Sequence, residues 1–143
     1  MTVMARVPVI PILLSLLPFF WTAPAVHAQE PAVASEIRGI AEDFGFLIIV
    51  DVVNNRYTGM QDITIAPAQG STYGREDFLH AVCAAVAQVT AQSIAYQTHL
   101  DMVMIDVNGE LWAISTENCR RAFRKGTEPA QRVLLGRSLQ RLR

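Results

Sequence analysis

The sequence predicts an α+β fold, in which a four-stranded, largely antiparallel sheet is made of two hairpins. One long helix packs on a face of this sheet, and short helices stand at the N- and C-terminal ends. Two observations lead to this prediction. Residues 78–100 contain no Lys, Arg, Asp or Glu, which is unusual for a surface helix and typical of a central one. Residues 102–115 flank Asn108-Gly109, the pair preferred in a two-residue type I′ hairpin turn.

Residues 1–28 have the three parts of a secretory signal peptide. Arg6 supplies a positive charge, residues 7–21 are uncharged and mostly apolar, and small residues follow, with Val26 and Ala28 at the positions that precede a cut. The apolar run is too short and too rich in proline for a membrane span, which needs ~20 residues. We therefore expect cleavage after Ala28 and a mature chain that is periplasmic or secreted.

The rest of the chain is long enough for one domain. We expect residues 29–126 to form a single disulfide-linked α+β domain and residues 127–143 to form a basic amphipathic helix or tail. Charge is distributed unevenly: residues 29–118 hold three basic and twelve acidic side chains, whereas residues 119–143 hold eight basic and one acidic. The body of the domain is therefore acidic and its end is basic.

The first half of the domain predicts a helix followed by two strands. Apolar residues recur at helical spacing between Ser35, which can cap a helix, and Gly45, which can end one. Residues 46–53 are rich in β-branched side chains and apolar in both alternating sets, which predicts a strand covered on both faces. A weaker strand follows at residues 62–66, and Pro67 suggests that it lies at an edge of the sheet.

The expected long helix at residues 78–100 has two unlike sides. The core side is mostly apolar and carries Phe78, Leu79, Val82, Cys83, Val86, Val89, Thr90 and Ser93. The opposite side is small and uncharged and carries Ala81, Ala84, Gln88, Ala91 and Ala95. Two interpretations of the opposite side stay open: the terminal helices bury it, or a protein partner or a second copy of the chain covers it.

In the hairpin at residues 102–115, the Asn108-Gly109 turn determines which residues of the two strands lie opposite each other. It pairs Val107 with Glu110, Ile105 with Trp112, and Val103 with Ile114. The side chains on the second face of the sheet are also mostly apolar, among them Leu47, Ile49, Met102, Met104 and Leu111. We expect the terminal helices to cover this second face.

The C-terminal region predicts two short helices, the first capped by Ser115 or Thr116 and the second beginning near Pro129. The basic tail has three interpretations: it docks on the acidic body, it binds an anionic surface such as phospholipid headgroups, or it is a flexible end. The candidates for contact with an anionic surface are Arg132, Arg137, Arg141 and Arg143. Nucleic acid is not an expected partner, because the compartment is wrong and the tail lacks interleaved aromatic residues.

Cys83 and Cys119 are the only cysteines. Two cysteines in an oxidising compartment most simply pair with each other, and the loop that they close is worth about 4 kcal/mol in the chain-entropy model. The alternative is a reactive thiol at Cys119, activated by the neighbouring cations Arg120 and Arg121.

Few residues suggest catalysis. The sequence has no Cys-x-x-Cys, His-Glu-x-x-His, Gly-x-Ser-x-Gly or P-loop motif, and it suggests neither a metal site nor a cofactor. The sequence therefore favours a small exported protein that works by binding. One alternative is a small periplasmic, hydrolase-like enzyme in which Asp101 orients His99 as a general base. The other is a protein held at a membrane surface by its basic C-terminal helix.

Overall fold

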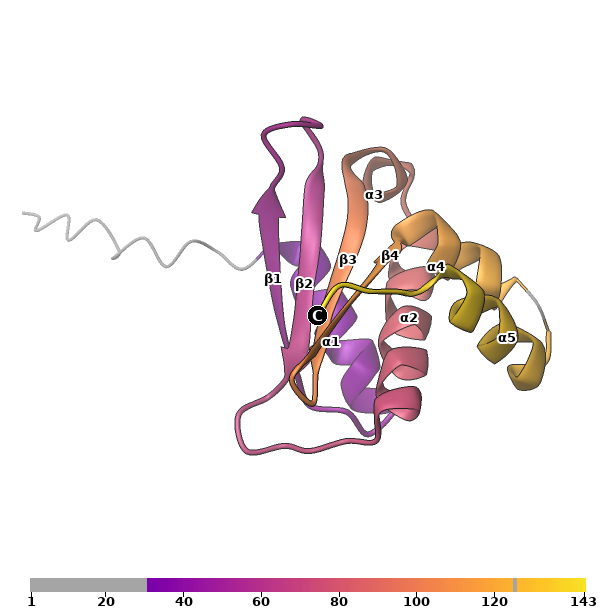
Figure 1. Ribbon diagram of the computed structural model, residues 1–143. Helices are drawn as coiled ribbons and strands as arrows, with labels where there is room; N and C mark the ends of the chain where they lie inside the picture. The colour runs from indigo at the N-terminus through magenta and orange to yellow at the C-terminus, as the bar shows by residue number, and fades with distance from the viewer. Residues whose placement is uncertain (1–30, 125) are drawn as a thin grey trace, which may run out of the picture.

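The computed structural model describes residues 31–124 and 126–143, and the predicted signal peptide lies outside the described residues. The described helices are α1 (Ala32–Asp43), α2 (Arg75–Ala91), α3 (Ile94–His99), α4 (Thr116–Phe123) and α5 (Glu128–Ser138). The described strands are β1 (Ile48–Asn54), β2 (Gln61–Pro67), β3 (Leu100–Val107), β4 (Glu110–Ser115) and β5 (Gln140–Arg141). Figure 1 shows the strands side by side, with the helices gathered behind the sheet and beside it.

The strands form one mixed sheet in the order β1-β2-β3-β4-β5. The pairs β1–β2, β3–β4 and β4–β5 are antiparallel, whereas β2 and β3 are parallel. The α+β class and the two hairpins are confirmed, but the four-stranded antiparallel sheet has to be corrected. Because α2 returns the chain to the starting end of β2, β3 enters the sheet in the same direction as β2. The chain then turns after α5 and adds β5 as a fifth strand.

The β3–β4 hairpin has the predicted register, with Val103 opposite Ile114 and Ile105 opposite Trp112. The turn residue Asn108 has φ 53°, and Gly109 has φ 77°. Two consecutive residues at positive φ define the type I′ turn, which Asn-Gly tolerates better than other pairs. The turn chemistry therefore fixes this part of the sheet locally.

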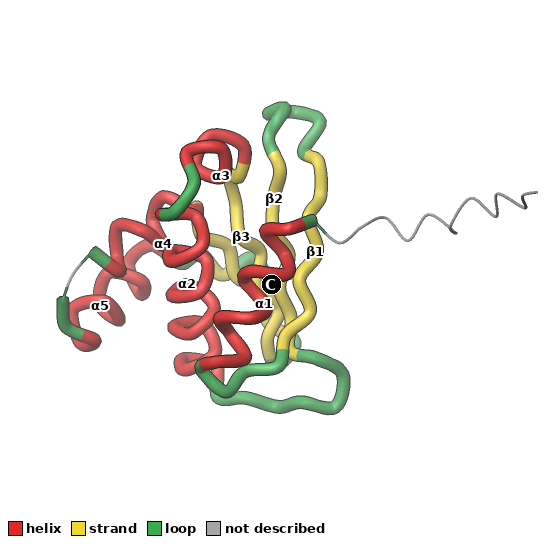
Figure 2. The backbone as a smooth tube through the Cα atoms, turned by 180° about the vertical axis from the view of Figure 1, so that it is seen from behind, coloured by secondary structure: helices red, strands yellow, loops and turns green. Residues whose placement is uncertain are grey.

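The hydrophobic core lies between the sheet and the helices α1, α2 and α4 on one of its faces (Figure 2). The residues predicted for the core side of the long helix, from Phe78 to Thr90, are buried. They face inward-pointing strand residues such as Ile63 and Ile105, which have no solvent exposure. Burial of a large aliphatic side chain stabilises a fold by about 1.5–3 kcal/mol, so this single layer of contacts supplies most of the driving force.

The second face of the sheet is open, contrary to two predictions. Ile49 and Val53 of β1, and Leu47 just before it, are each about half exposed, so β1 is covered on one face only. The terminal helices do not cover the second face: α1 packs against α2 on the core face, and α5 packs against α4. Antiparallel hairpins tolerate an open face because water can contact one side of the pleat while the core covers the other.

The predicted long helix is broken in two. α2 ends at Ala91, and the hydroxyl of Ser93 accepts a hydrogen bond at 3.3 Å from the backbone N–H of Tyr96 as the N-cap of α3. The side chain of Gln97 then donates to the Thr90 carbonyl at 3.1 Å. Ser93 is therefore a cap and not a core residue, and Leu100 is the first residue of β3.

Two smaller expectations also change. α1 begins before Ser35, at Ala32, although it ends as expected next to Gly45, which has φ 89°. β2 is an interior strand and β1 is the edge. Pro67 is tolerated because it is the last residue of β2, where the ladder of backbone hydrogen bonds ends.

Candidate functional site

The small, uncharged residues predicted as a partner surface do not share one environment. Ala81 is buried, Ala84 is half-buried, and Gln88 and Ala91 are exposed on the outer side of α2. Ala95 is exposed on the separate helix α3. The helix break therefore divides the predicted surface, and its α2 part lies next to α4.

A groove of about 570 Å³ runs along this outer side of α2. We call it the α2–α4 groove, and its lining consists of Phe44, His80, Ala84, Ala87, Gln88, Ala91, Gln97, Arg120, Phe123 and Arg124. Small-molecule sites occupy roughly 300–1,000 Å³ and are mostly apolar with a few polar groups. The groove therefore has the size and composition of a ligand site.

The walls of the groove are apolar because small residues of α2 stand between two aromatic side chains. Phe44 follows the last turn of α1 and is about half exposed. Phe123 ends α4, and its ring lies 5.1 Å from the His80 ring, measured between centroids. Since alanine leaves room where a larger residue would fill the gap, Ala84 and Ala91 make the groove possible.

The cationic side chains of the groove are Arg120 and Arg124, which α4 and the residue after it contribute. Arg120 is half-buried, and its Nη1 atom is buried without a hydrogen-bond partner among the described residues. Burial lowers the pKa of Arg120, Glu117 acts in the opposite direction, and Arg124 lowers it further by repulsion. Glu117 is itself paired with Arg121 at 3.1 Å. Two guanidinium groups thus line the groove without an ion pair among the described residues.

The groove shares Phe44, His80 and Ala84 with a neighbouring hollow of about 350 Å³ near the start of α2. Here Arg132 donates to Asp77 and to Glu128, each at 2.9 Å, and these hydrogen bonds raise the pKa of Arg132. One arginine therefore faces two carboxylates. This hollow therefore has an excess of negative charge, whereas the α2–α4 groove is lined by two arginines.

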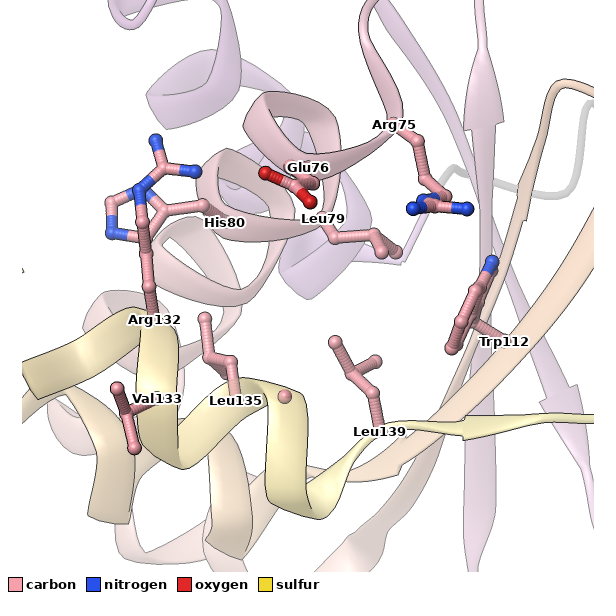
Figure 3. A pocket seen from close by; sticks show the side chains of 10 residues that line it. Arg75, Glu76, Leu79, His80, Trp112, Arg132, Val133, Leu135 and Leu139 are labelled. Carbon is pink, nitrogen blue, oxygen red and sulfur yellow. The ribbon is translucent and has the colours of Figure 1, made fainter. Parts of the chain in front are cut away.

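A second cavity, the α2–α5 pocket, has a volume of about 370 Å³ and lies between α2, α5 and β4. Figure 3 shows Leu135 of α5 and Leu139, the residue after α5, extending toward Leu79 of α2, with Arg75 close to Trp112. The guanidinium of Arg75 lies 5.7 Å from the centre of the Trp112 ring. Its charge is also paired with Glu110 at 3.5 Å. The α2–α5 pocket is apolar, and both of its arginines, Arg75 and Arg132, are in ion pairs.

His80 lines all three hollows. Its Nε2 atom lies 3.2 Å from Oε1 of Gln131, which connects α2 to α5. With one nitrogen held by this contact and its ring packed on Phe123, His80 separates the α2–α4 groove from the α2–α5 pocket.

Comparison with known proteins gives no guide to the chemistry of these hollows. No protein-family model, curated protein or solved structure matches this chain. The function is therefore argued from the geometry of the chain itself.

The two cysteines lie close together in the core. Cys83 on α2 and Cys119 on α4 are buried free thiols in this structure, 3.5 Å apart. Burial raises the pKa of Cys119 well above its ordinary value, and a hydrogen bond with Cys83 adds to the effect, while Arg120 acts weakly in the opposite direction. The expected activation of this thiol by Arg120 is therefore outweighed by burial.

The suggested catalytic pair is not assembled into a cavity. The Nδ1 atom of His99 lies 2.8 Å from the Ala95 carbonyl oxygen and 3.0 Å from the Thr98 hydroxyl, so local contacts engage it at the end of α3. Neither His99 nor Asp101 lines any of the three hollows. Among the described residues, no cluster of His, Cys, Asp and Glu has the form of a metal site.

Three of the four tail arginines predicted to contact an anionic surface are in ion pairs within the chain. Besides the contacts of Arg132, Arg141 lies 3.6 Å from Glu110, and Arg143 lies 3.6 Å from Asp106. Arg137 is exposed and forms no ion pair within the described part of the chain. None of the described helices is long and apolar enough to cross a bilayer.

Sequence reasoning missed the polar half of the groove. Arg120 and Arg124 were visible as basic residues, but their importance depends on α4 lying beside α2. The two cysteines were the available signal, because a contact between Cys83 and Cys119 brings these two helices together. Phe44 was missed because its position at the end of α1 suggested only a core residue.

Proposed function

We propose that this chain is a small exported protein that binds a ligand in the α2–α4 groove and catalyses no reaction. The observation that carries the proposal is the groove itself: apolar walls, a volume suited to a small molecule, and two arginines that form no ion pair within the described chain. The two histidines support the non-catalytic part of the proposal, because each imidazole is already engaged by a neighbour. His80 contacts Gln131, and His99 contacts the Ala95 carbonyl of its own helix.

The proposal includes export. A signal peptide at residues 1–28 and cleavage after Ala28 place the mature chain in the periplasm or outside the cell. In that oxidising environment, the adjacent thiols of Cys83 and Cys119 form a disulfide that ties α2 to α4 and so holds both walls of the groove together. Intact mass of protein recovered from an exporting host tests both points, since it reports the new N-terminus and the two missing hydrogens.

Ligand binding in the groove can be tested with a fluorescent dye and with a substitution that fills the groove. A neutral, solvent-sensitive fluorophore such as Prodan should brighten on binding to the wild-type protein, because the apolar walls exclude water from the dye. Ala84→Trp places an indole in the groove and should abolish the signal. Ala95→Trp is the matched control: the same exchange on α3, outside the groove, should leave the signal unchanged. Equal fluorescence with all three proteins would show that the groove is not a binding site.

The other expected partners remain proposals. A protein partner or a second copy of the chain, predicted for the small side of the long helix, would have to contact Gln88, Ala91 and the aromatic walls of the same groove. Contact with an anionic membrane through the tail would compete with the ion pairs that Arg132, Arg141 and Arg143 form within the chain. Exposed ion pairs are weak, about 0–1 kcal/mol, so binding to liposomes that disappears on removal of residues 127–143 would favour the membrane proposal.

A further inference from the structure

The α2–α4 groove is lined by two arginines, Arg120 and Arg124, that form no ion pair with any described residue. Arg120 is the more informative of its two arginines, because part of its guanidinium is removed from water while its Nη1 atom donates no hydrogen bond to any described residue. A buried donor without an acceptor is unfavourable, and most such groups in folded proteins find a partner. The acceptor missing from the described residues is the first indication of a ligand.

Other charges near the groove do not supply this acceptor. Glu117 is the acidic residue that raises the pKa of Arg120, but its carboxylate is already in an ion pair with Arg121. Arg124 adds a second positive charge to the lining, close enough to Arg120 to lower the pKa of Arg120. In contrast, the arginines of the α2–α5 pocket are paired with Glu110, Asp77 and Glu128. Only in the α2–α4 groove are both lining arginines without such a pair among the described residues.

The other lining residues of the groove indicate what kind of molecule would carry the negative charge. Beyond the arginines, the lining is dominated by Ala84, Ala87, Ala91 and the rings of Phe44 and Phe123. These surfaces favour an apolar chain or ring over a sugar or a peptide with many polar groups. Gln88 and Gln97 are both exposed amides of the lining, and the Gln97 side chain already donates to the Thr90 carbonyl.

We propose that the ligand of the α2–α4 groove is an organic carboxylate, with its charged group at Arg120 and Arg124 and an apolar body along α2. This proposal rests on the proposed function and specifies its ligand class. A guanidinium forms two parallel hydrogen bonds with a carboxylate, which matches its planar fork. A phosphate monoester offers similar oxygens, but its higher charge is more costly to remove from water beside alanine walls.

The test compares three naphthalene probes that share an apolar body. 2-Naphthoate carries a carboxylate, 2-naphthamide is its neutral analogue, and 2-naphthyl phosphate is the dianionic one; isothermal titration calorimetry measures the affinity of each for the purified protein. A hydrogen bond to a charged group is worth about 1.5–3 kcal/mol, which corresponds to roughly ten- to hundredfold in affinity. We expect 2-naphthoate to bind at least tenfold more tightly than either of the other probes.

Variants then assign the charge effect to one residue. Arg120→Gln should lower the affinity for 2-naphthoate roughly tenfold or more and leave that for 2-naphthamide unchanged, whereas Arg120→Lys should retain part of it. Arg137→Gln is the matched control, because Arg137 is exposed on α5 and does not line the groove. Circular dichroism with the wild-type spectrum and melting temperature shows that each variant is folded.

The possible results distinguish failure of the carboxylate proposal from failure of the proposal that the groove binds a ligand. Equal affinities for 2-naphthoate and 2-naphthamide, tighter binding of the phosphate, or an unchanged affinity in Arg120→Gln would overturn the carboxylate proposal and leave binding in the groove intact. If no probe binds and Prodan also fails, the groove is not a binding site and both proposals fall.

Discussion

Oxidation of Cys83 and Cys119 to a disulfide should raise the free energy of unfolding by about 4 kcal/mol over the dithiol form. The two residues are buried on α2 and α4 and lie 3.5 Å apart. Sulfur atoms in a disulfide are ~2.05 Å apart, so the bond requires a small adjustment of two side chains and no movement of a helix. The bond would close a loop of roughly 36 residues, and the chain-entropy model assigns such a loop about 4 kcal/mol.

Urea unfolding of the same protein with and without reductant measures this difference without any mutation. Trp112 packs against the core and serves as the fluorescent probe. With a denaturant dependence of ~2 kcal/mol per molar, 4 kcal/mol corresponds to a shift in the urea midpoint of about 2 M. Alkylation followed by intact mass establishes how many thiols are free in each sample.

Two results would refute the reasoning. Protein recovered from an oxidising compartment that takes up two alkyl groups after unfolding would show that the bond does not form. A confirmed disulfide with an unchanged midpoint would show that strain in the native state cancels the entropic gain.

Three further perturbations test the local structure and the titration of the core. Ser115→Ala should lower the free energy of unfolding by about 1 kcal/mol, because its hydroxyl caps α4 by accepting from the Asn118 N–H, whereas Ser35→Ala on the exposed side of α1 should change little. Gly109→Ala should lower the free energy of unfolding by about 1 kcal/mol, because Gly109 has φ 77°. The same exchange at Gly39, within α1 and with open space around it, should raise the free energy of unfolding. Chemical denaturation measures both changes, and two changes of the same sign would contradict the assignment of the turn. The pKa of Cys119 is raised in the native state above its ordinary value of 9.0, so the unfolded chain loses this proton first as the pH rises. The free energy of unfolding of the reduced protein should therefore be constant up to about pH 9 with respect to this group and should fall above it. An equally steep fall in the oxidised protein would contradict this origin.

The elements that the sequence predicts best are those in which neighbouring residues determine the backbone. Asn108-Gly109 needs no distant contact to form its turn, and the register of β3 against β4 follows from it. Ser115 is similar, because it directly precedes α4 and its hydroxyl accepts from the N–H of Asn118, three residues further on. Both features combine strong local chemistry with an apolar pattern that agrees with it.

Features that depend on distant contacts were harder to predict. Residues 46–53 are apolar in both alternating sets, and periodicity alone does not say which side the helices cover. Ser93 fits a helix face as well as it fits a cap, and the choice depends on where α3 packs. Its neighbour Tyr96 donates to Glu36 of α1 at 3.0 Å, a contact between residues far apart in the chain. The α2–α4 groove likewise exists only because Arg120 and Phe123 meet α2 from a separate helix.

The open edge of the sheet has a consequence for the solubility of the protein. β1 is an edge strand whose sequence, Ile-Ile-Val-Asp-Val-Val-Asn, would form a continuous aggregation-prone segment without its central residue. Asp51 is exposed in the middle of this strand, opposite Thr64 of β2. If two such edges met in antiparallel fashion about their centres, the two Asp51 carboxylates would face each other and repel. The Asp51 carboxylate is therefore placed where it opposes edge-to-edge pairing of an apolar strand.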